Sequence, residues 1–264
     1  MQAVQTGKFL DRIPFAKVGD GPDPILIING GQGFMMRPET ARLANDANRM
    51  ARIMPDGQHF ILLGYNPFPD ELSVHCIADD VAAIIKTQLG GRCRLVGVSY
   101  GAVVASNVAA RFPDRVAKLA LVAGAPAFSS HGRLLIAQQA DLARKGELVQ
   151  LLAQFNSVFR RPWFNLLLSL RIRLTSAKIR AKLSSPDTIC RYLNAMLDYD
   201  ATGLSFDGIG MLVVGGSRDQ FFGETIRSCK ARYPHACVVI LERETHMAPV
   251  ERPSDVKAAI TSFI

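Results

Sequence analysis

The chain has 264 residues, of which 48% are hydrophobic and 20% are charged, and its net charge is +8. It can therefore bury one large core, and it is at the upper end of the size of a single domain. The roughly eighteen uninterrupted apolar residues of a membrane span and the apolar core of a signal peptide are both missing. Five cysteines without a Cys-x-x-Cys pair disfavour a disulfide framework and a zinc ribbon. We therefore expect a cytoplasmic protein with free thiols and one main domain that carries an insertion.

The first half of the chain alternates between apolar runs and helical patterns. Residues 9–24 alternate loosely and then become turn-rich, which suggests an edge hairpin. Residues 25–28 and 60–63 are apolar throughout, as are parallel strands that are buried on both faces. Helical periodicity covers 39–53 and 79–89. Strands and helices at these lengths predict the α/β class, with a doubly wound and mostly parallel sheet.

A glycine-rich loop, residues 29–34, follows the first buried strand. Such a loop is usually only a tight connection, but its free backbone amides could also form half of an oxyanion hole. Its spacing does not match Gly-x-Gly-x-x-Gly and no phosphate-loop lysine follows, so nucleotide binding is disfavoured. His75 is predicted in the polar loop before the helix at 79–89, either as a solvated residue or as a substrate contact.

Gly97, Ser99 and Gly101 form a Gly-x-Ser-x-Gly motif between an apolar run and an Ala-rich helical pattern. A serine on a sharp turn from strand to helix has a strained backbone and needs very small residues two positions before and after it. Such a turn also directs the N–H of Tyr100 and the start of the next helix toward the point of attack. This context predicts a nucleophile elbow at Ser99.

The alternation stops after a predicted strand at 117–122, and helical periodicity covers residues 127–206. This change predicts a helical cap inserted into a core that consists of residues 1–126 and 207–264.

The positive charge is concentrated in the predicted cap. Between residues 131 and 200, eleven Lys or Arg residues face five Asp or Glu residues, so that +6 of the net +8 lies there. Segment 160–174 is basic and amphipathic and contains Trp163. It is either a plain solvated face or a surface for an acidic acyl carrier or an anionic membrane. Nucleic acid is not an expected partner, because no recognisable binding module is present.

Two later loops carry partners for a serine nucleophile. Asp219 follows an apolar strand at 211–214, and His246 follows one at 237–241. Serine needs a base, and the imidazole needs a carboxylate to orient it. Taken singly, Asp219 could be a turn residue and His246 an ordinary loop histidine. Because the carboxyl ends of parallel strands converge, their joint position predicts a Ser–Asp–His triad.

These motifs resemble those of the α/β-hydrolase superfamily over essentially the whole chain. The resemblance rests on four segments: residues 97–101, 110–122, 212–219 and 245–253. It implies the α/β-hydrolase fold with a helical cap, in which Ser99 is the nucleophile, Asp219 the acid and His246 the base. Neither a cofactor nor a metal is implied.

The resemblance also implies an oxyanion hole made of the amides of Tyr100 and of Gly31 or Gln32. Asn29 with Gly30 stands where the family usually has His-Gly, so the anchoring of this loop is expected to differ.

The pocket is expected to be apolar, because the predicted cap is rich in Leu and Phe. Residues 64–70 replace the Asp and the Gly-x-Gly-x-Ser turn that are usual in the family, which predicts an unusual pocket wall. Asn29, Phe34 and Trp163 are the predicted substrate contacts.

The predicted reaction is hydrolysis of a carboxylic ester, a lactone or a related acyl compound through an acyl-enzyme. Serine at the elbow disfavours epoxide opening and halide displacement, which use aspartate there. Three alternatives stay open: a thioesterase or acyltransferase acting on a carrier-bound acyl chain, a carbon–carbon bond hydrolase, and a non-catalytic ligand-binding member of the fold.

Overall fold

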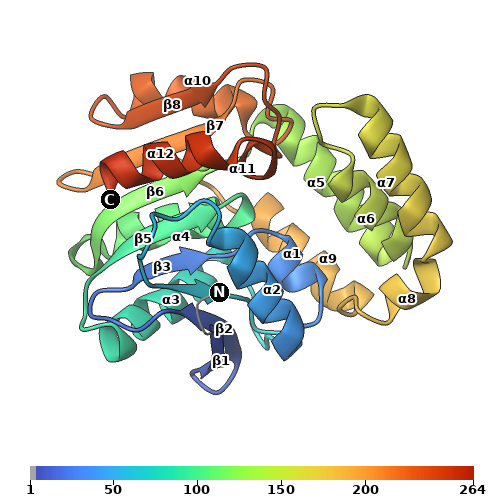
Figure 1. The fold of residues 1–264 in the computed structure, drawn as a ribbon, viewed down its shortest axis with the longest axis horizontal. Coiled ribbons are helices and arrows are strands. Elements are labelled where there is room, and N and C mark those ends of the chain that lie inside the picture. Colours follow the sequence, from blue (N-terminus) through green and yellow to red (C-terminus); the bar gives the residue numbers. More distant parts are fainter. Residues whose placement is uncertain (1–3) are drawn as a thin grey trace.

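In the computed structural model, which describes residues 4–264, the chain forms an eight-stranded sheet with helices on both faces (Figure 1). The strand order is β1-β2-β4-β3-β5-β6-β7-β8. β2 pairs antiparallel with both of its neighbours, the edge strand β1 and β4, and the strands from β4 to β8 in this order pair in parallel. The strands span Val4–Phe9 (β1), Ile13–Val18 (β2), Ile25–Ile28 (β3), Phe60–Leu63 (β4), Cys93–Val98 (β5), Val116–Val122 (β6), Gly210–Gly216 (β7) and Cys237–Leu241 (β8). The predicted α/β class with a mostly parallel sheet is confirmed.

Two apolar clusters cover the faces of the sheet. Helices α3, α4 and α10 pack in one cluster, and α2 and α12 pack in the other. The helices span Gln32–Met35 (α1), Thr40–Met50 (α2), Val74–Gln88 (α3), Tyr100–Arg111 (α4), Ser130–Arg144 (α5), Leu148–Asn156 (α6), Pro162–Leu174 (α7), Ser176–Arg180 (α8), Pro186–Leu197 (α9), Gly223–Arg232 (α10), Ala248–Glu251 (α11) and Pro253–Phe263 (α12). Within residues 4–264, none of them is long and apolar enough to cross a membrane.

Two local predictions near the N-terminus need correction. The edge hairpin turns at residues 10–12, where Leu10 and Asp11 have positive φ, and the turn-rich residues 19–24 instead connect β2 to β3. His75 lies in the first turn of α3 rather than in a preceding loop. The helix begins earlier because Ser73 caps it, its Oγ accepting a hydrogen bond from the N–H of Cys76 at 3.0 Å.

Helices α5 to α9 all lie between β6 and β7, within the predicted cap. In Figure 1, α6, α7 and α8 lie together at the right of the view, away from the sheet. Helix α5 is attached to the core at Ser129, the residue that caps its N-terminus. The Oγ of Ser129 accepts a hydrogen bond from the N–H of Gly132 at 3.0 Å and donates one to the carbonyl of Phe221 at 2.9 Å. This attachment lies close to the loop that carries Asp219.

Candidate active site

Ser99 connects β5 to α4 with a backbone conformation that L-residues rarely adopt, at φ 54° and ψ −118°. The two neighbouring glycines explain how the chain tolerates this turn. A Cβ on Gly97 would lie 2.5 Å from the carbonyl oxygen of Gly101, and a Cβ on Gly101 would clash with the carbonyl oxygen of Ile28. The Gly-x-Ser-x-Gly spacing is therefore a steric requirement of a sharp turn packed against β3.

The structure brings Ser99, His246 and Asp219 into one chain of hydrogen bonds. Ser99 Oγ lies 2.8 Å from His246 Nε2, and His246 Nδ1 lies 2.9 Å from Asp219 Oδ2. The other carboxylate oxygen of Asp219 accepts from the N–H groups of Phe221 and Phe222, both at 2.8 Å. An ionised carboxylate only accepts hydrogen bonds, so Nδ1 donates to it and Nε2 is left to accept from the serine hydroxyl.

All three side chains stand just beyond the carboxyl ends of parallel strands. Asp219 and His246 are buried, and the imidazole packs against the rings of Phe221 and Phe222 with centroids 4.9 and 5.9 Å away. Burial strengthens the electrostatic interaction between the carboxylate and an imidazolium. This geometry can activate a hydroxyl and can stabilise the positive charge that follows.

The predicted oxyanion donors flank Ser99. Tyr100 is the first residue of α4 and Gln32 is the first residue of α1, positions at which the N–H has no partner inside its helix. The N–H of Gly30 is already used, because it donates to Asn29 Oδ1 at 2.8 Å. A Cβ on Gly30 would lie 3.3 Å from Ser99 Cβ, so this loop passes directly beside the serine.

Asn29 is buried and holds this loop in place. Its backbone carbonyl accepts a hydrogen bond from the hydroxyl of Tyr65 at 2.5 Å. Burial raises the pKa of Tyr65 well above its usual range, so this hydroxyl stays a donor. Tyr65 was not predicted to contribute to the site, although it lies in the unusual segment 64–70 that replaces the family's pattern.

The structure does not bring Phe34 and Trp163 to the cavity beside Ser99. Phe34 is a buried residue of α1 and packs against the rings of Tyr65, Tyr100 and Tyr192. It points there because the short helix α1 starts directly after the glycines and turns its apolar side toward the core. Trp163 lies on α7, where its side chain is 55% exposed.

Ser99 opens into a cavity of about 320 Å³. The end of α2 supplies one wall, and α6 with the following segment supplies another. Its lining includes residues not predicted to contact substrate: Arg49, Met50, Arg52, Ile53, Phe155, Asn156 and Phe159. Among the described residues that line it, Arg49 and Arg52 are the charged ones, and none is a carboxylate. The helix predicted over residues 39–53 is α2, which is shorter and spans Thr40–Met50. Periodicity does not reveal that the end of this helix faces the serine.

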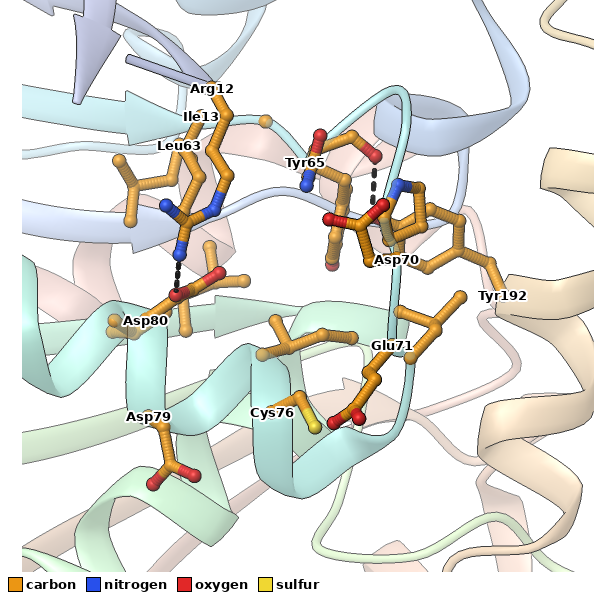
Figure 2. A pocket seen from close by; sticks show the side chains of 17 residues that line it. Arg12, Ile13, Leu63, Tyr65, Asp70, Glu71, Cys76, Asp79, Asp80 and Tyr192 are labelled. Atoms are coloured by element: carbon orange, nitrogen blue, oxygen red, sulfur yellow. Dashed lines mark hydrogen bonds and ion pairs between the residues drawn. The ribbon is translucent and has the colours of Figure 1, made fainter. Parts of the chain in front are cut away.

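A second cavity, of about 520 Å³, lies between the start of β2, the segment that follows β4, and α3 (Figure 2). Its wall is acidic and includes Asp70, Glu71, Asp79 and Asp80, the last of which pairs with Arg12 at 2.6 Å. Burial raises the pKa of Asp80 despite this arginine. The described lining contains no histidine, and its one thiol, Cys76, lies 3.1 Å from the hydroxyl of Ser73 rather than beside a base, so the cavity at Ser99 is the candidate active site.

The loop that carries His246 is tied to the predicted cap through Glu244, whose side chain is fully buried. Glu244 Oε1 lies 2.9 Å from a guanidinium nitrogen of Arg160 and 3.6 Å from one of Arg252. Arg160 precedes α7, and its backbone N–H also donates to the carboxylate of Glu251 at 3.1 Å. These contacts hold the segment between α6 and α7 against the loop of His246.

Comparisons with known proteins bear on the fold and the family of the chain. The model of the "Alpha/beta hydrolase family" matches residues 60–259, and no curated protein matches the chain. A carboxylesterase structure from Nitrososphaera gargenis has a TM-score of 0.74 at 15% identity, covering 98% of this chain and 97% of that chain. A malate-bound esterase from Thermogutta terrifontis has a TM-score of 0.69 at 20% identity, covering 99% and 97%. The structure of E-2-(acetamidomethylene)succinate hydrolase has a TM-score of 0.69 at 16% identity, covering 100% and 99%.

At these identities, the similar structures show a shared fold. The family model covers about three quarters of the chain and includes the elbow, Asp219 and His246. The chain belongs to the alpha/beta hydrolase family and is an enzyme of the hydrolase type.

Proposed function

We propose that the protein hydrolyses a carboxylic ester, a lactone or a related acyl compound through a covalent acyl-enzyme on Ser99. The observation that carries this proposal is the continuous hydrogen-bond chain from Ser99 Oγ through His246 to Asp219, with links of 2.8 and 2.9 Å. A serine with a base and an oriented carboxylate has the parts that nucleophilic acyl transfer requires.

In the first half of the reaction, Ser99 Oγ attacks the substrate carbonyl while His246 Nε2 takes the hydroxyl proton. The carboxylate of Asp219 stabilises the imidazolium, and the amides of Tyr100 and of Gly31 or Gln32 stabilise the negative oxygen of the tetrahedral intermediate. The bond from the carbonyl carbon to the leaving group then breaks, and the imidazolium returns its proton to the alcohol that departs.

In the second half, His246 takes a proton from water as the water oxygen attacks the acyl carbon. The second tetrahedral intermediate releases Ser99, which recovers a proton from the imidazolium, and the carboxylic acid leaves.

The cavity lining supports a substrate with an apolar part and a negatively charged end. Phe155 and Phe159 supply apolar surface, and Arg49 and Arg52 supply positive charge without a lining carboxylate. Arg49 lies 3.5 Å from the buried Asp46, whereas no ion-pair partner of Arg52 is present among the described residues. Two of the similar structures are named with dicarboxylates: one has malate bound, and the other is a hydrolase of a succinate derivative.

Thioesters are the second candidate class. Arg49 and Arg52 would also attract the phosphates of a carrier-bound acyl chain, and the chemistry on Ser99 would be unchanged.

A fluorophosphonate probe combined with a substrate panel tests the proposal. The wild type should be labelled at Ser99 and should hydrolyse soluble esters, while Ser99→Ala should lose labelling and several orders of magnitude in rate. Ser106→Ala is the matched control. Ser106 is a buried serine on α4, the helix that follows Ser99, and its hydroxyl donates to the carbonyl of Ala102. Folded wild type without labelling would favour a non-catalytic binding role, and labelling with turnover restricted to ketone substrates would favour carbon–carbon hydrolysis.

A further inference from the structure

Helix α7 turns a row of large apolar side chains toward solvent. Each member of this row is between 52% and 77% exposed. The row, here called the outer stripe, consists of Trp163, Leu166, Leu167, Leu170 and Leu174. Together with Phe164, which is 39% exposed, they make six of the nine exposed large hydrophobic side chains in residues 4–264, all on one helix of 13 residues. Contiguous apolar surface of this kind marks an interaction site.

The spacing places these side chains on one line. Successive residues of an α-helix are rotated by about 100°, so positions i, i+3, i+4, i+7 and i+11 share a face. By the same rotation, Arg171 and Arg173 lie on the two flanks of the stripe. The opposite side packs inward: Ile172 is buried, and the Asn165 side chain bonds to the backbone of Phe159 at 3.0 Å. The helix is thus held by one face while the other is uncovered.

The surroundings of the stripe carry positive charge without compensation. Residues 148–186 contain seven Lys or Arg residues and no Asp or Glu. Of these seven, Arg160 pairs with Glu244, and the other six form no ion pair within the described chain. These six are Arg161, Arg171, Arg173, Lys178, Arg180 and Lys182.

This charge argues against a second copy of the chain as the occupant of the stripe. A second copy of the chain would bring two uncompensated basic segments together, and their repulsion opposes such a dimer. An anionic lipid surface matches both features, because acyl chains accept the apolar row while headgroup phosphates pair with flanking arginines. A tryptophan in the row is also typical of helices that lie at a membrane interface.

We propose that α7 docks the protein on anionic lipid bilayers, with the outer stripe at the boundary between headgroups and acyl chains and with Arg171 and Arg173 among the phosphates. Docking itself does not depend on the proposed hydrolase activity. Its consequence does: Phe155 and Phe159, just before α7, line the cavity of Ser99, so docking would bring that cavity near acyl compounds dissolved in the bilayer.

Trp163 provides a direct probe, because it is the only tryptophan of the chain. Its emission should shift to shorter wavelength on mixing with vesicles of phosphatidylglycerol and phosphatidylcholine, and it should stay unchanged with phosphatidylcholine alone. Flotation of the full chain with the same vesicles should give the same preference, and raising the salt concentration should weaken binding.

Two double variants separate the contribution of the apolar side chains to docking from that of the arginines. Leu167→Ser with Leu170→Ser should abolish flotation, and Arg171→Glu with Arg173→Glu should weaken binding to the anionic vesicles by at least about tenfold. Leu134→Ser is the matched control, since Leu134 is an equally exposed leucine on α5. All these variants should hydrolyse a soluble ester as the wild type does, so a failure of docking is distinguishable from a failure of the proposed chemistry.

Two results would overturn the proposal. One is the absence of both the emission shift and flotation with anionic vesicles. The other is a concentration-dependent dimer in sedimentation experiments that the double leucine variant disrupts while vesicle binding is unaffected, which would assign the outer stripe to self-association.

Discussion

Around Ser99, the polar side chains of Asp219 and His246 are buried and partnered. Along α7, the apolar side chains are exposed, and Arg171 and Arg173 form no ion pair among residues 4–264. The first region is held by steric contacts with backbone, such as that between Gly101 and Ile28. The second is held only along its inner face. Because tight packing restrains the geometry at Ser99, substitutions there should change the rate of the reaction for every substrate. Substitutions in the walls and in the inserted helices should instead change which molecules reach the serine.

The largest effect is expected from Asp219→Asn. The amide would still accept from Phe221 and Phe222, but its NH₂ would face His246 Nδ1 and would favour the tautomer in which Nε2 carries the proton. That tautomer cannot accept the hydroxyl proton of Ser99. We expect kcat to fall by about 10⁴-fold, the loss known for this change in a serine-protease triad. Steady-state rates on a soluble ester measure it.

Asp207→Asn is the control for this variant, because Asp207 lies in an exposed turn before β7 and bonds with Ser205. A loss of less than tenfold in Asp219→Asn, with an unchanged melting temperature, would contradict the proposed role of the carboxylate.

Gly101→Ala tests the steric restraint in the same region. Alanine normally favours a helix over glycine by about 1 kcal/mol, but here its Cβ would clash with the carbonyl oxygens of Ile28 and Asn29. We expect a net destabilisation of about 1–3 kcal/mol and a drop of several degrees in Tm. In Gly210→Ala the new Cβ would meet its nearest neighbour at 3.7 Å, an ordinary contact, so its melting curve should be nearly unchanged. Equal melting temperatures of the two variants would refute the steric argument.

The wall of the cavity is tested by Arg52→Ala. If Arg52 attracts a negative substrate, its removal should raise KM for an ester that carries a free carboxylate by about threefold to tenfold, since an exposed charge contact contributes roughly 1 kcal/mol. KM for the corresponding neutral ester and kcat for both should stay the same. Arg92→Ala serves as control, because Arg92 immediately precedes β5 whereas Ser99 immediately follows it, so that the two residues lie at opposite ends of this strand. A parallel change in KM for both esters would argue against charge recognition.

The smallest effect is expected where the two regions meet. Arg160→Ala removes one of the two arginines beside the buried Glu244. Arg252 remains to balance the negative charge of Glu244. Since both guanidinium groups are more than a third exposed, the loss of stability should be about 1 kcal/mol or less, which is roughly 2–4 °C in Tm. The neighbouring Arg161→Ala, with no ion pair in the described chain, should melt like the wild type. Indistinguishable melting curves for the two variants would show that the Arg160–Glu244 pair contributes no measurable stability.

The sequence by itself determined the sheet, the position of the elbow and the family. Apolar runs such as 25–28 and 60–63 and the glycines around Ser99 express requirements that act over a few residues, namely burial on both faces and steric space in one turn. Asp219 and His246 were predictable as candidates because strand ends of a parallel sheet converge. The position of the hairpin turn depended on the positive φ angles of Leu10 and Asp11, and the start of α3 depended on the cap at Ser73. A broad turn-rich pattern in the sequence does not resolve either of these local features.

Tertiary structure alone decided the lining of the cavity and the outward direction of α7. Arg52 lies 47 residues before Ser99 in the sequence and still lines its cavity, whereas Phe34, on α1, packs against Tyr100 and Tyr192 instead, because these positions depend on how distant segments pack. Periodicity likewise predicted that residues 160–174 are amphipathic but not which face is covered. That depended on Ile172 packing inward and Asn165 bonding to Phe159, contacts that exist only after the inserted helices have assembled.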